Sequence, residues 1–125
     1  TRDSAYLADV YPVMHGAAQF FVDMLVEDPK TKYLVTAPTT SPENAYRLPN
    51  GNTASICAGS TMDNQIIREL FTNTINAAAI LGVDSDFAQV LAAKKARLMP
   101  TSIGRDGSRT SSPSCFSFLW SLSGK

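Results

Sequence analysis

The stretch STMDNQIIRELFTNTINAAAILG, residues 60–82, decides the fold class of this chain. Its apolar residues recur at steps of three and four, which is the spacing of the buried face of an amphipathic helix. They are Met62, Ile66, Ile67, Leu70, Phe71, Ile75 and Ala78. Ser60 or Thr61 suits the N-cap, and Asp63 stands at the capping-box position after Ser60. Leu81-Gly82 is typical of a glycine stop, so the stretch predicts a long helix between these ends.

Helical periodicity continues on both sides of this stretch. Upstream, residues 5–27 repeat apolar side chains at helical steps. Asp28-Pro29 predicts the end of that helix, because the residue before a proline avoids helical dihedrals. Pro12 either occupies the first turn of the main helix or kinks a longer one. Downstream, Asp84 is expected to cap a third helix, which Met99-Pro100 closes.

The apolar stripes on the predicted helices are wide. For the two flanking helices, the side chains expected to point inward are Val10, Val13, Met14, Ala17, Phe20, Phe21, Met24 and Leu25, followed by Phe87, Val90, Leu91 and Leu98. Three helices cannot bury stripes of this width among themselves. We therefore expect partner helices that are missing from this chain.

A long connection joins the first two helices. Tyr33 to Thr36 is rich in β-branched and aromatic residues and predicts a short strand, and Ala54 to Cys57 is a candidate for a second one. Three prolines and the Asn50-Gly51 turn interrupt residues 37–59. Loops of this length are uncommon in compact domains and often carry function. The fold prediction is mainly α, with about three helices and a small loop that bears a β-hairpin.

Composition excludes several classes of function. Eleven basic and eleven acidic residues cancel, so neither nucleic acid nor an anionic membrane is an expected partner. No apolar run approaches the roughly 20 residues of a membrane helix. Cys57 and Cys115 fit neither a disulfide framework nor a metal spacing, and no phosphate loop occurs. We expect no metal and no cofactor, and His15 is most simply a surface or packed histidine.

Chemistry is predicted for the segment TTSPEN, residues 39–44. Glu43 follows a proline on a long loop and is flanked by hydroxyl and amide side chains. A general acid needs such a fixed position, and a raised pKa that keeps it protonated near neutral pH. A solvated, inert Pro-Glu turn is the alternative interpretation. For Asp63, capping of its helix is the simplest interpretation.

Nine blocks of the sequence occur in an order and spacing that resemble the catalytic domain of glycoside hydrolase family 95. They are YPVM (11–14), GAAQFF (16–21), LVEDPK (25–30), YLVTAP (33–38), SPEN (41–44), ICAG (56–59), TMD (61–63), QIIRELF (65–71) and IG (103–104). The resemblance covers residues 5–107. It implies a fragment of an (α/α)6 barrel, in which paired helices form two rings and the loops at one end build the sugar pocket.

The resemblance also implies an activity and roles for individual residues. The family removes terminal α-L-fucose, typically α-1,2-linked, from oligosaccharides or glycans with inversion. Glu43 matches the family's general-acid segment and would protonate the departing glycosidic oxygen. Asn44, Ser41 and Thr39 would orient it or line the pocket, and Asp63 would be a further substrate-side candidate. A fucosylated glycan is thus the expected partner.

Other parts of the family's machinery are absent from this sequence. Inversion needs a second group about 6.5–9.5 Å away to activate water, and the family segments that supply it lie outside this window. We therefore expect an internal piece that is inactive without the remainder of its catalytic domain. Ser60 stands where family members commonly have proline. Residues 108–125, with seven serines, do not match the family and suggest an out-of-frame tail.

Two alternatives to the fucosidase interpretation stay open. One is an α-L-galactosidase of the same family, since L-galactose differs from L-fucose by a hydroxyl on the exocyclic carbon. The other is a non-catalytic helical interaction module or gene remnant. Analogy with the family suggests a secreted or periplasmic location.

Overall fold

The computed structural model describes residues 3–40, 46–47, 50–103 and 109–110 of the 125. Three helices and eight two-residue strands lie within these ranges. The helices are α1 (Ser4–Met24), α2 (Thr61–Leu81) and α3 (Ser85–Ala96). The strands are β1 (Val26–Glu27), β2 (Leu34–Val35), β3 (Thr39–Thr40), β4 (Tyr46–Arg47), β5 (Thr53–Ala54), β6 (Ile56–Cys57), β7 (Ser102–Ile103) and β8 (Arg109–Thr110). The expected mainly helical fold is confirmed, and it fits a part of an (α/α)6 barrel.

The chain divides into two compact units. We call the first the helical unit; it comprises Thr1–Met24 and Ile66–Leu98. The second, the strand unit, comprises Leu25–Gln65 and Met99–Lys125. Helix α2 begins in the strand unit and continues into the helical unit, so the two units are described separately below.

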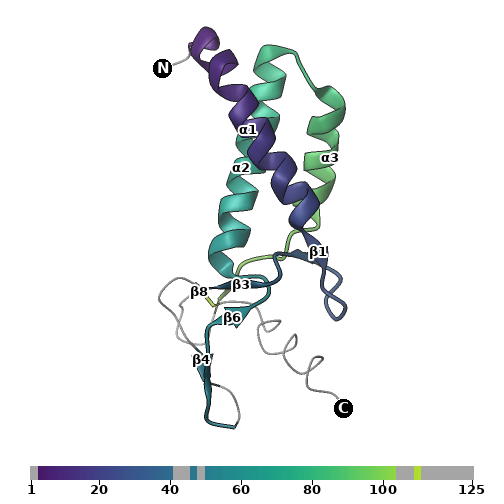
Figure 1. Cartoon of the computed structure of the whole chain (residues 1–125). Helices are drawn as coiled ribbons and strands as arrows, with labels where there is room; N and C mark the ends of the chain where they lie inside the picture. The colour runs from purple at the N-terminus through teal and green to yellow at the C-terminus, as the bar shows by residue number, and fades with distance from the viewer. Residues whose placement is uncertain (1–2, 41–45, 48–49, 104–108, 111–125) are drawn as a thin grey trace. The chain divides into compact units, whose positions relative to one another are not determined.

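The helical unit is built from α1, α3 and most of α2, and Figure 1 shows α1 crossing α2 obliquely toward the end of α3. Tyr11 of α1 packs against Ala77 and Ala78 of α2, and Ala88 of α3 joins the same cluster. Ile67, Phe71 and Leu91 are also fully buried. Polar contacts join the helices too: Lys95 Nζ donates to Thr72 Oγ1 at 2.8 Å. The core of this unit is therefore formed by the residues on one side of each predicted apolar stripe.

The other side of those stripes is exposed. Val13 is 74% exposed and Phe20 59%, although the pattern predicted both to point inward. Ile66 and Val90, at 50% and 43%, were also predicted to point inward, and so was Met62 of the strand unit, at 45%. The predicted apolar faces were thus wider than the faces that are buried among the described residues.

The ends of the helices correct two further expectations, the end of α1 and the cap of α3, and exclude one of the two alternatives for Pro12. Helix α1 ends at Met24 rather than near Asp28, because Val26 and Glu27 form the strand β1. Asp3 caps its start, with Oδ1 accepting a bond from the Ala5 amide at 2.9 Å. Pro12 therefore lies inside the helix and not in its first turn. Asp84 stands at the N-cap of α3, but its side chain makes no capping hydrogen bond.

The strand unit consists of antiparallel pairs. In β1–β2, Val26 faces Val35 and Glu27 faces Leu34. The pair β4–β5 is nested inside β3–β6, where Thr39 faces Cys57 and Thr40 faces Ile56. The candidate second strand at residues 54–57 is divided between two pairs: Ala54 belongs to β5 and pairs with β4, whereas Ile56 and Cys57 form β6 and pair with β3. Strands β7 and β8 form the fourth pair.

A small apolar core holds the strand unit together. Val35, Ala58 and Met99 are buried there, with Ala37 packed against them. The Met99 amide donates to the Leu34 carbonyl at 3.4 Å, which attaches the segment after α3 to β2. This core lies directly beside Thr36, which follows Val35 in the chain.

Candidate active site

Two of the five predicted site residues lie in the described part of the chain. Thr39 is in β3, and Asp63 is in the first turn of α2. The structure brings these two together, although 24 positions separate them in the sequence. Ser41, Glu43 and Asn44 lie outside the described residues.

The carboxylate of Asp63 is the centre of a polar cluster in the strand unit. Its Oδ2 accepts a hydrogen bond from Thr36 Oγ1 at 2.7 Å and a short one from Thr39 Oγ1. Both hydroxyls therefore donate to the same oxygen. Hydrogen bonds to a charged acceptor are stronger than those between neutral groups. Asp63 thus binds both ends of the turn formed by residues 36–39.

The same turn is held from a second direction. The Gly59 amide donates to the Thr36 carbonyl at 2.8 Å, and Thr36 is only 1% exposed. Beyond the turn, β3 pairs with β6. Thr36 and Thr39 are therefore fixed through their side chains by α2 and through their backbone neighbours by the segment that precedes α2.

Ser60 provides the helix cap that the sequence predicted. Its Oγ accepts a hydrogen bond from the Asp63 amide at 3.1 Å, which satisfies one of the free amides of the first turn. In a full capping box the acidic side chain would bond back to the residue at the N-cap. The Asp63 carboxylate instead bonds to the two threonines. Capping accounts for Ser60 and leaves the role of the Asp63 side chain to be explained.

Gly59 and Asn64 shape the backbone beside this cluster. Gly59 has φ +69°, and a Cβ there would lie 3.0 Å from Val35 Cγ1. Asn64 is 5% exposed and its Nδ2 donates to the Gly59 carbonyl at 3.5 Å. Its Oδ1 has no hydrogen-bond partner among the described residues. The approach of α2 to β2 therefore requires a glycine at position 59.

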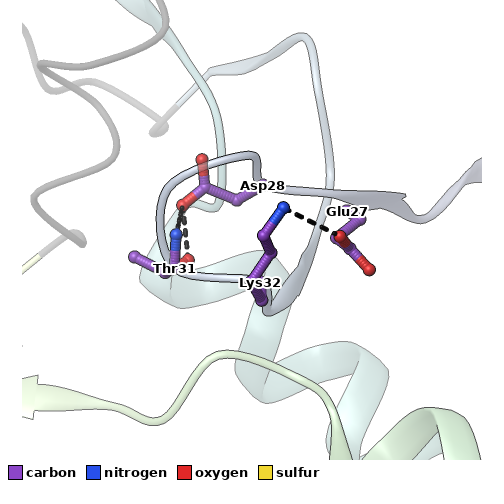
Figure 2. A network of polar contacts seen from close by, with 4 residues as sticks. All are labelled: Glu27, Asp28, Thr31 and Lys32. Atoms are coloured by element: carbon purple, nitrogen blue, oxygen red, sulfur yellow. Dashed lines mark hydrogen bonds and ion pairs between the residues drawn. The ribbon is translucent and has the colours of Figure 1, made fainter.

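The turn before β2 has its own aspartate, as Figure 2 shows. The Asp28 carboxylate accepts bonds from the Thr31 amide at 3.1 Å and from the Thr31 hydroxyl. The Lys32 amide donates to the Asp28 carbonyl, while Lys32 Nζ lies 3.5 Å from Glu27 Oε1. These contacts close the β1–β2 pair and so fix the strand that leads to Thr36.

A second polar cluster, in the helical unit, is formed by Tyr11, His15 and Asp84. Tyr11 Oη donates to Asp84 Oδ2 at 3.0 Å, and His15 Nε2 lies 4.0 Å from the same oxygen. The His15 ring packs on Phe87 with centroids 4.1 Å apart. Burial, followed by the hydrogen bond to the Asp84 carboxylate and its charge, raises the pKa of Tyr11 to about 12. Tyr11 thus donates a hydrogen bond that joins α1 to the residue before α3.

Other features of the described residues carry no hydrolytic chemistry. A cavity of about 330 Å³ lies between the end of α2 and the start of α3, and Ser85 is the only polar side chain in its lining. Cys57 is a buried free thiol. Within the described ranges no group of three acidic, histidine or cysteine side chains could hold a metal ion, and none of the helices is long and apolar enough to span a membrane.

Sequence reasoning missed Thr36 as a member of the site. It was counted only as a strand residue, and its partner Asp63 stands 27 positions away. The order of polar residues in one chain does not show such a contact. The signal that could have found it is a buried threonine at the end of an apolar strand, since a buried hydroxyl needs a partner.

The sequence model of the glycosyl hydrolase family 95 catalytic domain matches residues 1–109. Alpha-L-fucosidase 2 from Arabidopsis thaliana is 42% identical over 111 residues, which make up 86% of this chain and 13% of the relative. Probable alpha-fucosidase A from Aspergillus niger is 33% identical over 104 residues, 80% of this chain and 12% of the relative. The match places the chain within a glycoside hydrolase catalytic domain.

More narrowly, this chain belongs to glycosyl hydrolase family 95. It spans about one eighth of the length of the two curated relatives, 13% and 12%. The matched region contains the Thr36, Thr39 and Asp63 cluster as well as Glu43.

Proposed function

We propose that these residues form part of an α-L-fucosidase that removes terminal, typically α-1,2-linked L-fucose from glycans with inversion. Glu43 is the general acid, which protonates the glycosidic oxygen as the bond breaks. The observation that carries the proposal is that both relatives bear the name of a fucosidase over a matched region of more than 100 residues.

The anchoring of β3 supports a catalytic role for the segment that follows it. General acid catalysis requires a group held at a fixed position relative to the departing oxygen. Thr39 stands four residues before Glu43 in the sequence, and its hydroxyl is bound to the first turn of a 21-residue helix. The chain that leads into the Glu43 segment is therefore attached to a long regular element.

The cluster also limits how Thr39 and Asp63 contact a sugar. A hydroxyl has one hydrogen to donate, and Thr39 donates it to Asp63. Thr39 can therefore only accept a hydrogen bond from a sugar hydroxyl. Asp63 uses Oδ2 for both threonines, and its Oδ1 can accept from a sugar hydroxyl as well. Ser41 and Asn44 complete the proposed sugar-side group around Glu43.

A chimera provides the test of this activity. Residues 1–109 of this chain replace the matching segment of alpha-L-fucosidase 2, and the product is incubated with 2′-fucosyllactose. We expect release of fucose, first in the β-configuration if the reaction inverts, which proton NMR resolves. No release by the chimera, while the unmodified relative assayed in parallel releases fucose, would contradict the proposal.

Substitution of Glu43 tests its role within the chimera. Glu43→Gln should lower kcat on 2′-fucosyllactose by about 10²–10⁴-fold, which is the usual contribution of a general acid. The loss should be much smaller on α-L-fucosyl fluoride, because fluoride departs without a proton. Equal losses on the two substrates would remove the general-acid assignment.

The isolated 125 residues should be inactive, because inversion also needs a group that activates water on the opposite face of the sugar. The same assay on the purified chain checks this, and turnover above the blank would show that the chain supplies both groups. Running an α-L-galactoside beside the fucoside determines the sugar preference of the chimera.

A further inference from the structure

The two threonine bonds to Asp63 Oδ2 are not explained by helix capping or by a sugar contact through Oδ1. The Asp63 amide already bonds to Ser60 Oγ, so this capping contact is made without the carboxylate. The carboxylate is then free to reach two hydroxyls of a different segment, Thr36 and Thr39, through a single oxygen. A carboxylate used in this way joins two parts of the chain.

The carboxylate is held firmly at its own end. Asp63 lies in the first turn of α2, whose backbone is regular over 21 residues. The Asn64 amide donates to the Ser60 carbonyl at 3.1 Å, and the Asn64 side chain donates to the Gly59 carbonyl. The position of the Asp63 side chain is therefore set by the helix and by the turn in front of it.

At its other end the contact fixes the turn before β3. Thr36 is bound twice, because its carbonyl also accepts a hydrogen bond from the Gly59 amide. Thr39 stands closer in sequence to residues 41–45 than Thr36 does, and its hydroxyl bonds to Asp63. Glu43 follows Thr39 by four residues, so a fully extended chain would place it within roughly 14 Å of that anchor. Thr39 is thus the described Asp63 partner that stands nearest to Glu43 in the sequence.

We infer that Asp63 is a positioning residue for the general acid, acting through the Thr36 and Thr39 hydroxyls to fix the start of the Glu43 segment. The inference rests on the proposed role of Glu43. Small misplacements of catalytic groups have large effects on rate, because the reacting atoms must be held within about 3–3.5 Å. Losing the contact should therefore impair the step that needs the proton and spare the steps that do not.

The test uses the chimera with four substitutions. Asp63→Asn weakens the acceptor, Thr39→Val removes the hydroxyl at nearly constant volume, and Thr39→Ser keeps the hydroxyl. Thr53→Val is the matched control, since it makes the same change at an exposed position of β5. For each variant, kcat and KM are measured on 2′-fucosyllactose and on α-L-fucosyl fluoride.

We expect Asp63→Asn and Thr39→Val to lower kcat on 2′-fucosyllactose by about 10–100-fold, part of the 10²–10⁴-fold that a general acid supplies. On the fluoride the loss should stay within about threefold by the same argument. Thr39→Ser should restore most of the 2′-fucosyllactose rate that Thr39→Val loses, and Thr53→Val should keep near-normal rates on both substrates. Equal losses on both substrates, or none on 2′-fucosyllactose, would overturn the inference. If Asp63→Asn prevents folding, judged by thermal melting, the comparison of Thr39→Val with Thr39→Ser decides.

Glu43→Gln, measured in the same series, separates this inference from the proposed function. A selective loss in Glu43→Gln without one in Asp63→Asn and Thr39→Val would reject the positioning role and leave the general acid in place. A chimera that releases no fucose, or a Glu43→Gln variant with no selective loss, would reject the proposed function and the inference with it.

Discussion

Asp63 and Asp84 each stand at the start of a helix, one in the strand unit and the other in the helical unit. The sequence favoured a capping role for both. In the structure both carboxylates bond to hydroxyls from distant parts of the chain: Asp63 to Thr36 and Thr39, and Asp84 to Tyr11. A capping pattern therefore locates the start of a helix, whereas the partner of the carboxylate depends on what packs beside it.

The two aspartates differ in what their contacts hold. Asp63 binds a turn and a strand that lead to Glu43, and its helix is capped independently by Ser60. Asp84 is in a left-handed backbone conformation with φ 51°, and its carboxylate joins α3 to α1. We therefore expect loss of Asp63 to affect catalysis most and loss of Asp84 to affect stability alone.

The largest expected effect comes from exchanging each aspartate for asparagine in the chimera. Asp63→Asn should reduce kcat on 2′-fucosyllactose by about 10–100-fold. Asp84→Asn should change it by less than about threefold while lowering the melting temperature of the isolated 125-residue chain by a few degrees, as loss of roughly 1 kcal/mol does. Parallel kinetics and thermal melts check the contrast. Comparable kinetic losses in the two variants would mean that both act only through the general integrity of the fold.

Two glycines with nearly equal φ angles provide the next comparison. Gly59 has φ +69° and Gly82 +68°, but only at Gly59 would a Cβ meet other atoms, 3.0 Å from Val35 Cγ1. Gly82→Ala should cost about 1 kcal/mol, from the left-handed conformation alone. Gly59→Ala should cost about 2 kcal/mol or more, because the contact with Val35 adds to it.

Urea unfolding of the 125-residue chain measures both free energies. Combining Gly59→Ala with Val35→Ala, which removes the contacted methyl groups, should cost less than the sum of the two single changes. Additivity of the two substitutions would show that the approach of α2 to β2 is not what requires Gly59.

The accuracy of the sequence-based predictions varies along the chain. Helix α2 was predicted well, because its periodic apolar residues, the Ser60 cap and the Gly82 stop are all local signals. The prediction for the end of α1 was wrong, because local sequence signals could not show that Val26 and Glu27 pair with β2. Pairing energies come from residues elsewhere in the chain and override local preference.

The candidate site was predictable only in part for the same reason. Thr39 and Asp63 were chosen separately, on resemblance, and their contact was not foreseen. Thr36 was missed because nothing at a spacing of 27 residues indicates that a threonine and an aspartate meet. Val13 and Phe20 belong to the predicted apolar stripe but are exposed. A local pattern could not predict this, because it does not show which neighbours pack against each side of a helix.

A smaller effect is expected from deleting one hydroxyl in each cluster. Thr36→Val should cost about 1–2 kcal/mol, because the hydroxyl is 1% exposed and donates at 2.7 Å to a carboxylate that then loses a partner. Tyr11→Phe should cost about 0.5–1 kcal/mol, since its acceptor Asp84 has a side chain 45% exposed and regains water. Urea unfolding of the chain compares the two, and a larger loss in Tyr11→Phe would reverse the expected ranking of the clusters.

The last expected effect is a loss of stability at alkaline pH that originates in the helical unit. Burial and the Asp84 carboxylate raise the pKa of Tyr11 to about 12 in the folded chain, from 10.0. Since the unfolded chain releases this proton first, the stabilisation is complete below pH 10 and is lost as the pH rises from 10 to 12. The urea midpoint should therefore fall between pH 9.5 and 11.5 in the parent chain, by more than it falls in Tyr11→Phe.

The matched control for this measurement is Tyr6→Phe, which removes a hydroxyl from the same helix at a position that is 66% exposed. It should retain the full alkaline loss of the parent, because the Tyr11 contact with Asp84 is untouched. If Tyr11→Phe lost stability between pH 9.5 and 11.5 as steeply as Tyr6→Phe does, the alkaline response would originate outside the Tyr11 and Asp84 pair. The two clusters would then differ only in what their carboxylates hold, and not in how they respond to pH.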